Sequence, residues 1–115
     1  MSTKPGDIYS YEDRQTEPNT ATITLDQAPK IPKGKVVRIE TMFIVDETTP
    51  AKTLALGFDK GGTSHLVQKE TVGAAVNGLA LDAPLILVEG EKPIAVVTTP
   101  TANDVITFIA RGVYV

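Results

Sequence analysis

Short runs of alternating apolar and polar residues, each bounded by Gly, Pro, Asn or Asp, fill this chain from residue 20 to its end. The turn signals recur roughly every 8 to 12 residues, which is typical of a sandwich or barrel. Roughly a third of the residues are Val, Ile or Thr, and these β-branched side chains favour strands over helices. The pattern predicts an all-β fold: an antiparallel two-sheet sandwich, jelly-roll-like, with about eight strands after Asn19.

The longest clean alternation is VVRIETMFIVD, residues 36–46. Successive side chains of a strand point to opposite faces, so one set should face the core. We assign to the core Val37, Ile39, Thr41, Phe43 and Val45. The opposite face changes from charged to apolar at Met42 and Ile44, and we expect something else to cover these two side chains.

Other runs predict further strands. Inward rows are expected from two of them, formed by Ala21, Ile23 and Leu25 and by Leu54, Leu56 and Phe58. The closing run at 104–115 is apolar on both faces and predicts an interior strand. Only the stretch at 70–81 could form a short helix, although Gly73 and Gly78 disfavour one, and an irregular strand is the alternative.

The first nineteen residues differ from the rest, because Ile8, Tyr9 and Tyr11 are the only large apolar groups between Asp7 and Asn19. Ordering such a segment costs about 20 to 40 kcal/mol of backbone entropy. Backbone hydrogen bonds to a sheet edge or to a neighbouring subunit would have to offset that cost. We therefore predict an extended N-terminal arm (1–19) that is ordered by docking on other molecules, followed by a self-sufficient sandwich domain (20–115). A disordered tail is the alternative.

The residues that usually carry catalysis are scarce. The chain has no cysteine, which removes thiol chemistry and leaves His65 as the sole soft ligand for zinc. Ser64 and His65 are adjacent, but neighbouring strand residues face opposite ways and cannot form a nucleophile–base pair. No catalytic residue, cofactor or metal site is predicted. A calcium site remains an open alternative, built from loop carboxylates of Asp46, Glu47, Asp59 or Asp82.

Charge and hydropathy exclude other partners. The net charge is −3, and Lys and Arg are spread singly, which disfavours direct binding of nucleic acid. No apolar run approaches the length of a membrane span, and the N-terminus lacks the features of a signal peptide. We therefore expect synthesis in a cytoplasm and no membrane partner.

Three segments carry a resemblance to a known class of proteins: IPKGKVVRIETMFIV, KTLALGFDKGG and EKPIAVVTTPTANDVITFIARGVYV. Together they span residues 31–115. They resemble the small virion structural proteins of tailed bacteriophages, the capsid decoration or cement class, in their Pro-Lys-Gly turn, Leu-x-Leu-Gly turn and Thr-rich closing hairpin. The resemblance implies a jelly roll or related β fold, no catalytic motif, and dimers or trimers that clamp neighbouring capsomers, often through an N-terminal arm.

On this basis we expect a noncatalytic decoration or cement protein on the outer surface of a phage capsid. Its partners would be the major capsid protein and further copies of the chain. The residues expected to bind partners are Ile8, Tyr9, Tyr11, Met42 and Ile44. A tail, baseplate or collar component is the nearest alternative, and a glycan- or host-surface-binding sandwich is an alternative from another class.

Overall fold

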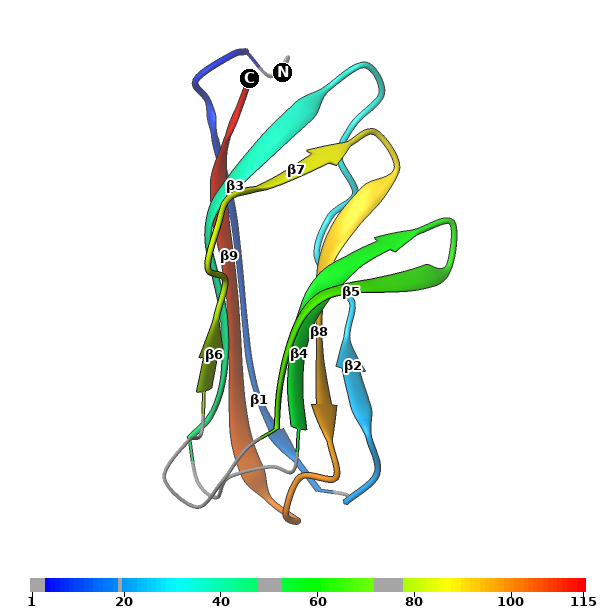
Figure 1. Ribbon diagram of the computed structural model, residues 1–115, viewed down its shortest axis with the longest axis vertical. Helices are drawn as coiled ribbons and strands as arrows, with labels where there is room; N and C mark the ends of the chain where they lie inside the picture. The colour runs from blue at the N-terminus through cyan, green and yellow to red at the C-terminus, as the bar shows by residue number, and fades with distance from the viewer. Residues whose placement is uncertain (1–3, 19, 48–52, 72–77) are drawn as a thin grey trace.

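The computed structural model describes residues 4–18, 20–47, 53–71 and 78–115, and over these ranges the chain forms nine strands and no helix (Figure 1). The strands are β1 (Ile8–Glu17), β2 (Ile23–Leu25), β3 (Val36–Asp46), β4 (Thr53–Lys60), β5 (Thr63–Thr71), β6 (Gly78–Ala80), β7 (Leu85–Val88), β8 (Glu91–Thr98) and β9 (Asp104–Tyr114).

Two antiparallel sheets pack face to face. Sheet A has the order β1-β9-β3-β6, with β7 also paired to β3, and sheet B has the order β2-β8-β4-β5. Strands β6 and β7 share one position in sheet A, because β6 pairs with Phe43–Val45 and β7 pairs with Val36–Ile39. When β6 and β7 are counted as one strand, the eight strands are distributed between the two sheets in the order that defines a jelly roll. This arrangement confirms the predicted all-β sandwich.

The core lies between the two sheets. Its largest fully buried side chains include Phe108, Ile39, Leu54, Leu56, Leu87 and Ile94. They come from both sheets, as expected for inward-facing residues of a sandwich. Leu54 and Leu56 therefore lie where the sequence placed them, while Phe58 is half-buried.

A β-bulge in β3 overturns part of the predicted core. The pairing of β3 with β9 shifts between Ile39 and Thr41, so one extra residue enters β3 and the facing of every later side chain reverses. Met42 (1% exposed) and Ile44 (0%) therefore point inward with Ile39, and Thr41 is exposed. The expectation that Met42 and Ile44 lie on a face covered by a partner is wrong, because the bulge turns them into the core.

Glycine in the neighbouring strand permits this bulge. Gly112 of β9 lies opposite Ile39, and a Cβ atom there would clash with the carbonyl oxygen of Arg38. The close approach of the two backbones therefore requires a residue without a side chain at position 112.

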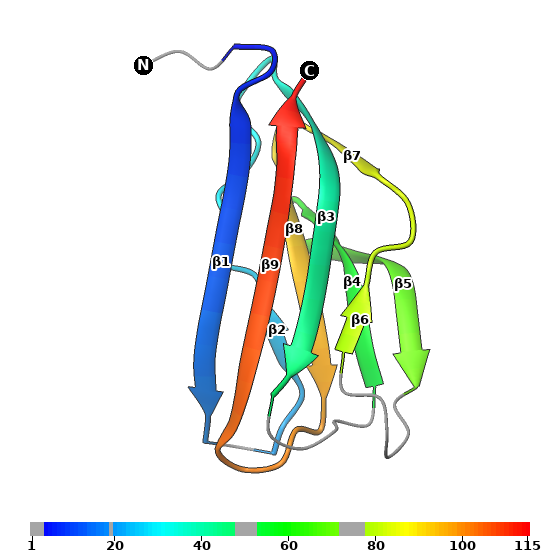
Figure 2. The same ribbon diagram turned by 90° about the vertical axis from the view of Figure 1, so that its left-hand side faces the viewer.

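The predicted N-terminal arm, called the leader from here on, contributes strand β1 to the sandwich itself. Every residue of β1 pairs with β9, from Ile8 opposite Val113 to Glu17 opposite Asp104, and Figure 2 shows the two strands side by side along their length. The leader is extended, as predicted, but the boundary between a 1–19 arm and a 20–115 domain is wrong for the described residues. The hydrogen-bonding groups that the leader needs come from β9 of the same chain.

The end of the chain behaves as its pattern indicated. Strand β9 lies between β1 and β3, which confirms the predicted interior strand.

Of the predicted run at 20–25, only Ile23–Leu25 is a strand. The segment at 70–81, for which a short helix or an irregular strand was expected, includes residues 72–77, which lie outside the described residues. Its described parts contain strand and no helix: Glu70 and Thr71 end β5, and Gly78–Ala80 is β6. No described segment forms a helix that could cross a membrane.

Candidate interaction surface

The outer face of sheet A carries apolar side chains that the other sheet does not cover. They alternate with the buried residues along their strands and remain partly exposed: Ile8, Val36, Phe43, Val45, Ile86, Val88, Val105, Ile109 and Val113. Strand pairing makes them neighbours, since Ile8 lies opposite Val113 and Phe43 lies opposite Ile109. Ile8 and Ile86 are the most exposed of the set, at 69% and 53%. Both faces of this sheet therefore carry apolar side chains.

All three arginines of the sequence lie on this same face, each next to a glutamate. The Nε atoms of Arg14 and Arg38 lie 3.0 Å from Glu47 and 2.6 Å from Glu40, and an amino group of Arg111 lies 3.9 Å from Glu12.

The described lysines, in contrast, lie in loops or on β4, β5 and β8. The outer face thus combines apolar side chains with arginine, a residue type that is enriched at protein interfaces relative to the rest of the surface.

One of these ion pairs links three elements of sheet A. Glu47, just after β3, accepts hydrogen bonds from the hydroxyl of Thr107 on β9 and from Arg14 on β1. Both hydrogen bonds hold the pKa of the Glu47 carboxyl below its usual value, and the bond from Thr107 has the larger effect. Arg14 is therefore held in a defined orientation on the surface.

The five residues expected to bind partners separate into two groups. Ile8 lies on the outer face of sheet A and is exposed. Tyr9, Met42 and Ile44 are buried, and Tyr11 is half-buried with its ring edge against Phe108. Burial leaves Tyr9, Met42 and Ile44 no surface to offer a partner, so these three assignments are corrected.

Sequence reasoning missed the arginines of this face. The three arginines are far apart in the sequence, and only the pairing of β9 with β1 and β3 brings them together. The placement of Arg38 and Arg111 within apolar alternating runs was a signal that could have found these two, whereas Arg14 lies in a polar stretch and gave none.

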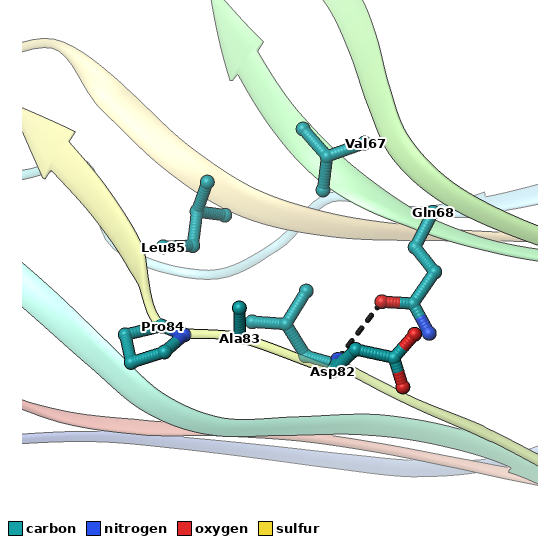
Figure 3. Close-up of a pocket in the computed structure, with 7 residues that line it drawn as sticks. Val67, Gln68, Asp82, Ala83, Pro84 and Leu85 are labelled. Carbon is teal, nitrogen blue, oxygen red and sulfur yellow. Dashed lines mark hydrogen bonds between the residues drawn. The ribbon is translucent and has the colours of Figure 1, made fainter.

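A second feature is an open pocket of about 360 Å³ between β5 and the link from β6 to β7 (Figure 3). Its lining is mostly apolar: Val67, Gln68, Leu81, Asp82, Ala83, Pro84 and Leu85. The Gln68 side chain crosses the gap, donating to the Ala80 carbonyl (2.5 Å) and accepting from the Asp82 N–H (2.9 Å). Gln68 therefore ties sheet B to sheet A at this open side.

The residues considered for chemistry do not gather. The ring of His65 stacks on Phe58, with centroids 5.0 Å apart, and Asp59 accepts a hydrogen bond from the Gly62 N–H of the β4–β5 turn. Within the described ranges, no three His, Asp or Glu side chains are placed to hold a metal ion. Of the candidate calcium ligands, Asp46 and Glu47 are adjacent at the end of β3, while Asp59 lies on β4 and Asp82 lies between β6 and β7.

Comparison with known proteins adds little beyond the fold. The chain matches no protein-family model and no curated protein. Among solved structures, it is similar to the Drosophila NLP core, described for pentamer formation and histone binding, with 8% identity, 93% of this chain and 97% of that chain covered, and a TM-score of 0.44. It is also similar to the family 32 carbohydrate-binding module of C. perfringens NanJ, solved with galactose, with 13% identity, 92% and 93% covered, and a TM-score of 0.40.

Proposed function

We propose that this protein is a noncatalytic structural protein that decorates or cements the capsid of a tailed phage, bridging major capsid subunits. The observation that carries the proposal is the outer face of sheet A, where all three arginines lie among partly exposed apolar side chains. Arginine is among the residue types enriched at the energetic centres of protein interfaces, and the buried core of an interface is more apolar than its rim. The sequence resemblance to decoration proteins supports a capsid as the partner.

The leader is not a separate capsid-binding arm in this proposal, because β1 pairs with β9 of its own chain along its whole length. It contributes through the outer face of sheet A, on which Ile8 and Arg14 lie. A weak contact at this face becomes strong on a shell, since several copies engage repeated sites at the same time.

Co-sedimentation with purified tailed-phage heads that lack their decoration protein tests the proposal. We expect the wild-type chain to bind heads, and Ile86→Glu and Ile109→Glu to bind at least about tenfold more weakly, since each places a charge in the apolar surface. The matched control is Leu66→Glu on β5 of sheet B, because Leu66 is exposed to a similar extent, at 46%.

Three outcomes contradict the proposal. Binding to isolated tails and not to heads would indicate a tail component, and a saturable saccharide hit in a glycan screen would indicate a glycan-binding module. Binding to heads that Leu66→Glu weakens as much as Ile86→Glu would show that the outer face of sheet A is not the contact.

A further inference from the structure

The described part of the sandwich has four outer strand positions, and three of them are protected against pairing with another chain. Strand β2 is only three residues long. In β5, the register shift opposite Leu56 and Gly57 leaves Val67 as an extra residue, which makes a bulge. The β6–β7 edge is interrupted by Pro84, and Gln68 occupies the backbone groups next to Leu81. Short strands, bulges and proline are the usual means of blocking an edge.

Strand β1 has none of these three protections, although it carries the charged residues Glu12, Asp13, Arg14 and Glu17, and charge is another means of guarding an edge. It runs for ten residues in unbroken register with β9, contains no proline and no bulge, and has no other partner among the described strands. Figure 2 shows β1 at the margin of sheet A with β9 on one side only.

The direction of the backbone groups of β1 follows from its pairing. Tyr114 donates its N–H to the carbonyl of Asp7 at 2.9 Å, and Asn103 donates to the carbonyl of Glu17 at 2.7 Å, so odd-numbered residues turn toward β9. In an antiparallel ladder the residues alternate, so the even-numbered residues turn their N–H and C=O groups to the open edge. These residues, Ile8, Ser10, Glu12, Arg14 and Thr16, are all exposed.

We propose that β1 pairs antiparallel with β1 of a second copy, across a two-fold axis at Asp13. Pairing through the open edge must join even-numbered residues to even-numbered residues. An axis at Asp13 meets this condition, and it places Glu12 opposite Arg14 of the other copy and Arg14 opposite its Glu12. Opposite charges in directly facing positions stabilise a strand pair, and the two-fold symmetry forms this contact twice.

The neighbouring symmetric registers are worse. An axis at Glu12 places two glutamates face to face, and an axis at Arg14 does the same with two arginines. Like charges directly opposite destabilise a pair of strands, so charge selects the register centred on Asp13. The existing ion pairs leave room for it. Arg14 contacts Glu47 through Nε, which leaves its two amino groups to reach a second carboxylate, and Glu12 lies 3.9 Å from Arg111, beyond hydrogen-bond distance.

One feature works against the dimer and supplies a test. The two Asp13 side chains would meet at the axis on the inner side, where each accepts a hydrogen bond from Tyr11 at 3.3 Å. Their repulsion sets the affinity below what the Glu12–Arg14 pairs alone would give. The dimer would also join the outer faces of two A sheets into one wider surface, but it rests on the edge of β1 and not on capsid binding.

A disulfide cross-link reports the axis directly, because the chain has no cysteine of its own. Residues at a pair without hydrogen bonds lie about 4.5 Å apart between Cα atoms, which is within the range for a disulfide. We expect Asp13→Cys in the full chain to form an interchain disulfide under mild oxidation. The control Gln15→Cys should not, since the register separates its two copies by roughly 13 Å. Equal cross-linking of both variants, or none at Asp13→Cys, overturns the proposal.

Mass measurement by sedimentation equilibrium tests the edge itself. The wild-type chain of 12.2 kDa should dimerise reversibly, and Ser10→Pro should be monomeric with its fold retained, because it removes an N–H that faces outward. The control Ser64→Pro changes the β5 edge and should leave the dimer intact. Asp13→Asn should lower the dissociation constant several-fold. A wild-type chain that stays monomeric at millimolar concentration, or an oligomer that Ser10→Pro does not change, overturns the proposal.

Discussion

The Tyr9 hydroxyl donates a hydrogen bond to the carbonyl oxygen of Pro29 across 2.9 Å and so fastens β1 to the loop between β2 and β3. The Tyr9 ring is 4% exposed and lies edge-on to Tyr114, with centroids 6.3 Å apart. A side chain from the leader is therefore part of the core and joins β1 to β9 and to the loop between β2 and β3.

Replacing Tyr9 by phenylalanine keeps the ring and removes this hydrogen bond. We expect Tyr9→Phe to lower the free energy of unfolding by about 1 kcal/mol, the usual net value of one hydrogen bond. Chemical denaturation measures the change. The control is Tyr11→Phe, whose hydroxyl bonds only to Asp13 at 3.3 Å, and it should cost less. An equal or larger loss for Tyr11→Phe would contradict the role of the Pro29 contact.

The ionisation of Tyr9 should make the fold sensitive to alkali. Burial, with smaller contributions from Tyr114 and Tyr11, raises the pKa of Tyr9 above the ordinary tyrosine value of 10. The folded state thus holds this proton more tightly than the unfolded chain, so the stabilisation is complete below pH 10 and is lost as the pH rises above it. Burial and Asp13 also raise the pKa of Tyr11. Denaturation between pH 9 and pH 11 should therefore show a fall in unfolding free energy that is shallower in Tyr9→Phe.

Deleting the leader should unfold the protein. Removal of residues 1–18 takes away β1, leaves β9 without its partner along ten positions, and exposes the rings of Phe108 and Tyr114. The burial of one large aromatic side chain contributes several kcal/mol, which is a large part of the stability of a small domain. We expect circular dichroism of the truncated chain to show no cooperative thermal transition. A sharp transition near that of the full chain would restore the view of the leader as a separate arm.

A methyl group at position 112 should be costly. Gly112→Ala drives a Cβ atom into the Arg38 carbonyl at the bulge of β3, where both backbones are held in a sheet. We expect a loss of about 2 to 4 kcal/mol of unfolding free energy. Gly78→Ala is the control, because its Cβ atom would lie 3.2 Å from the Val45 side chain, which can shift, and 3.4 Å from the Ile44 carbonyl oxygen, which is an ordinary contact. Similar melting temperatures for the two variants would contradict the tight contact at Gly112.

The Gln68 bridge should be detectable by local exchange. Gln68→Leu removes both hydrogen bonds across the open side of the sandwich. We expect a loss of about 1 kcal/mol and faster hydrogen exchange at the Asp82 amide. Lys69→Leu, a neighbouring exposed position, should leave exchange at Asp82 unchanged. Unchanged exchange in Gln68→Leu would show that the Asp82 amide is protected by another group.

Local alternation was sufficient to predict the strands and the sandwich. It placed β9 in a sheet interior because both of its faces are apolar, and it placed Leu54 and Leu56 in the core. Such patterns depend on neighbouring residues alone, because a strand places alternate side chains on opposite faces and its apolar face is buried away from water in any fold. The bulge at Ile39 and Thr41 was not predicted, because it arises from the match between β3 and β9, about 70 residues apart.

The sequence by itself determined that the chain forms β-strands that are apolar on one face or on both faces. It also determined that the chain carries few groups suited to catalysis. Only the tertiary structure decided which edge receives the leader and that Arg14, Arg38 and Arg111 share one face. The physical reason is that backbone N–H and C=O groups are the same in every residue. Hydrogen bonding alone therefore cannot specify a partner strand, and the partner is chosen by packing between residues distant in the sequence.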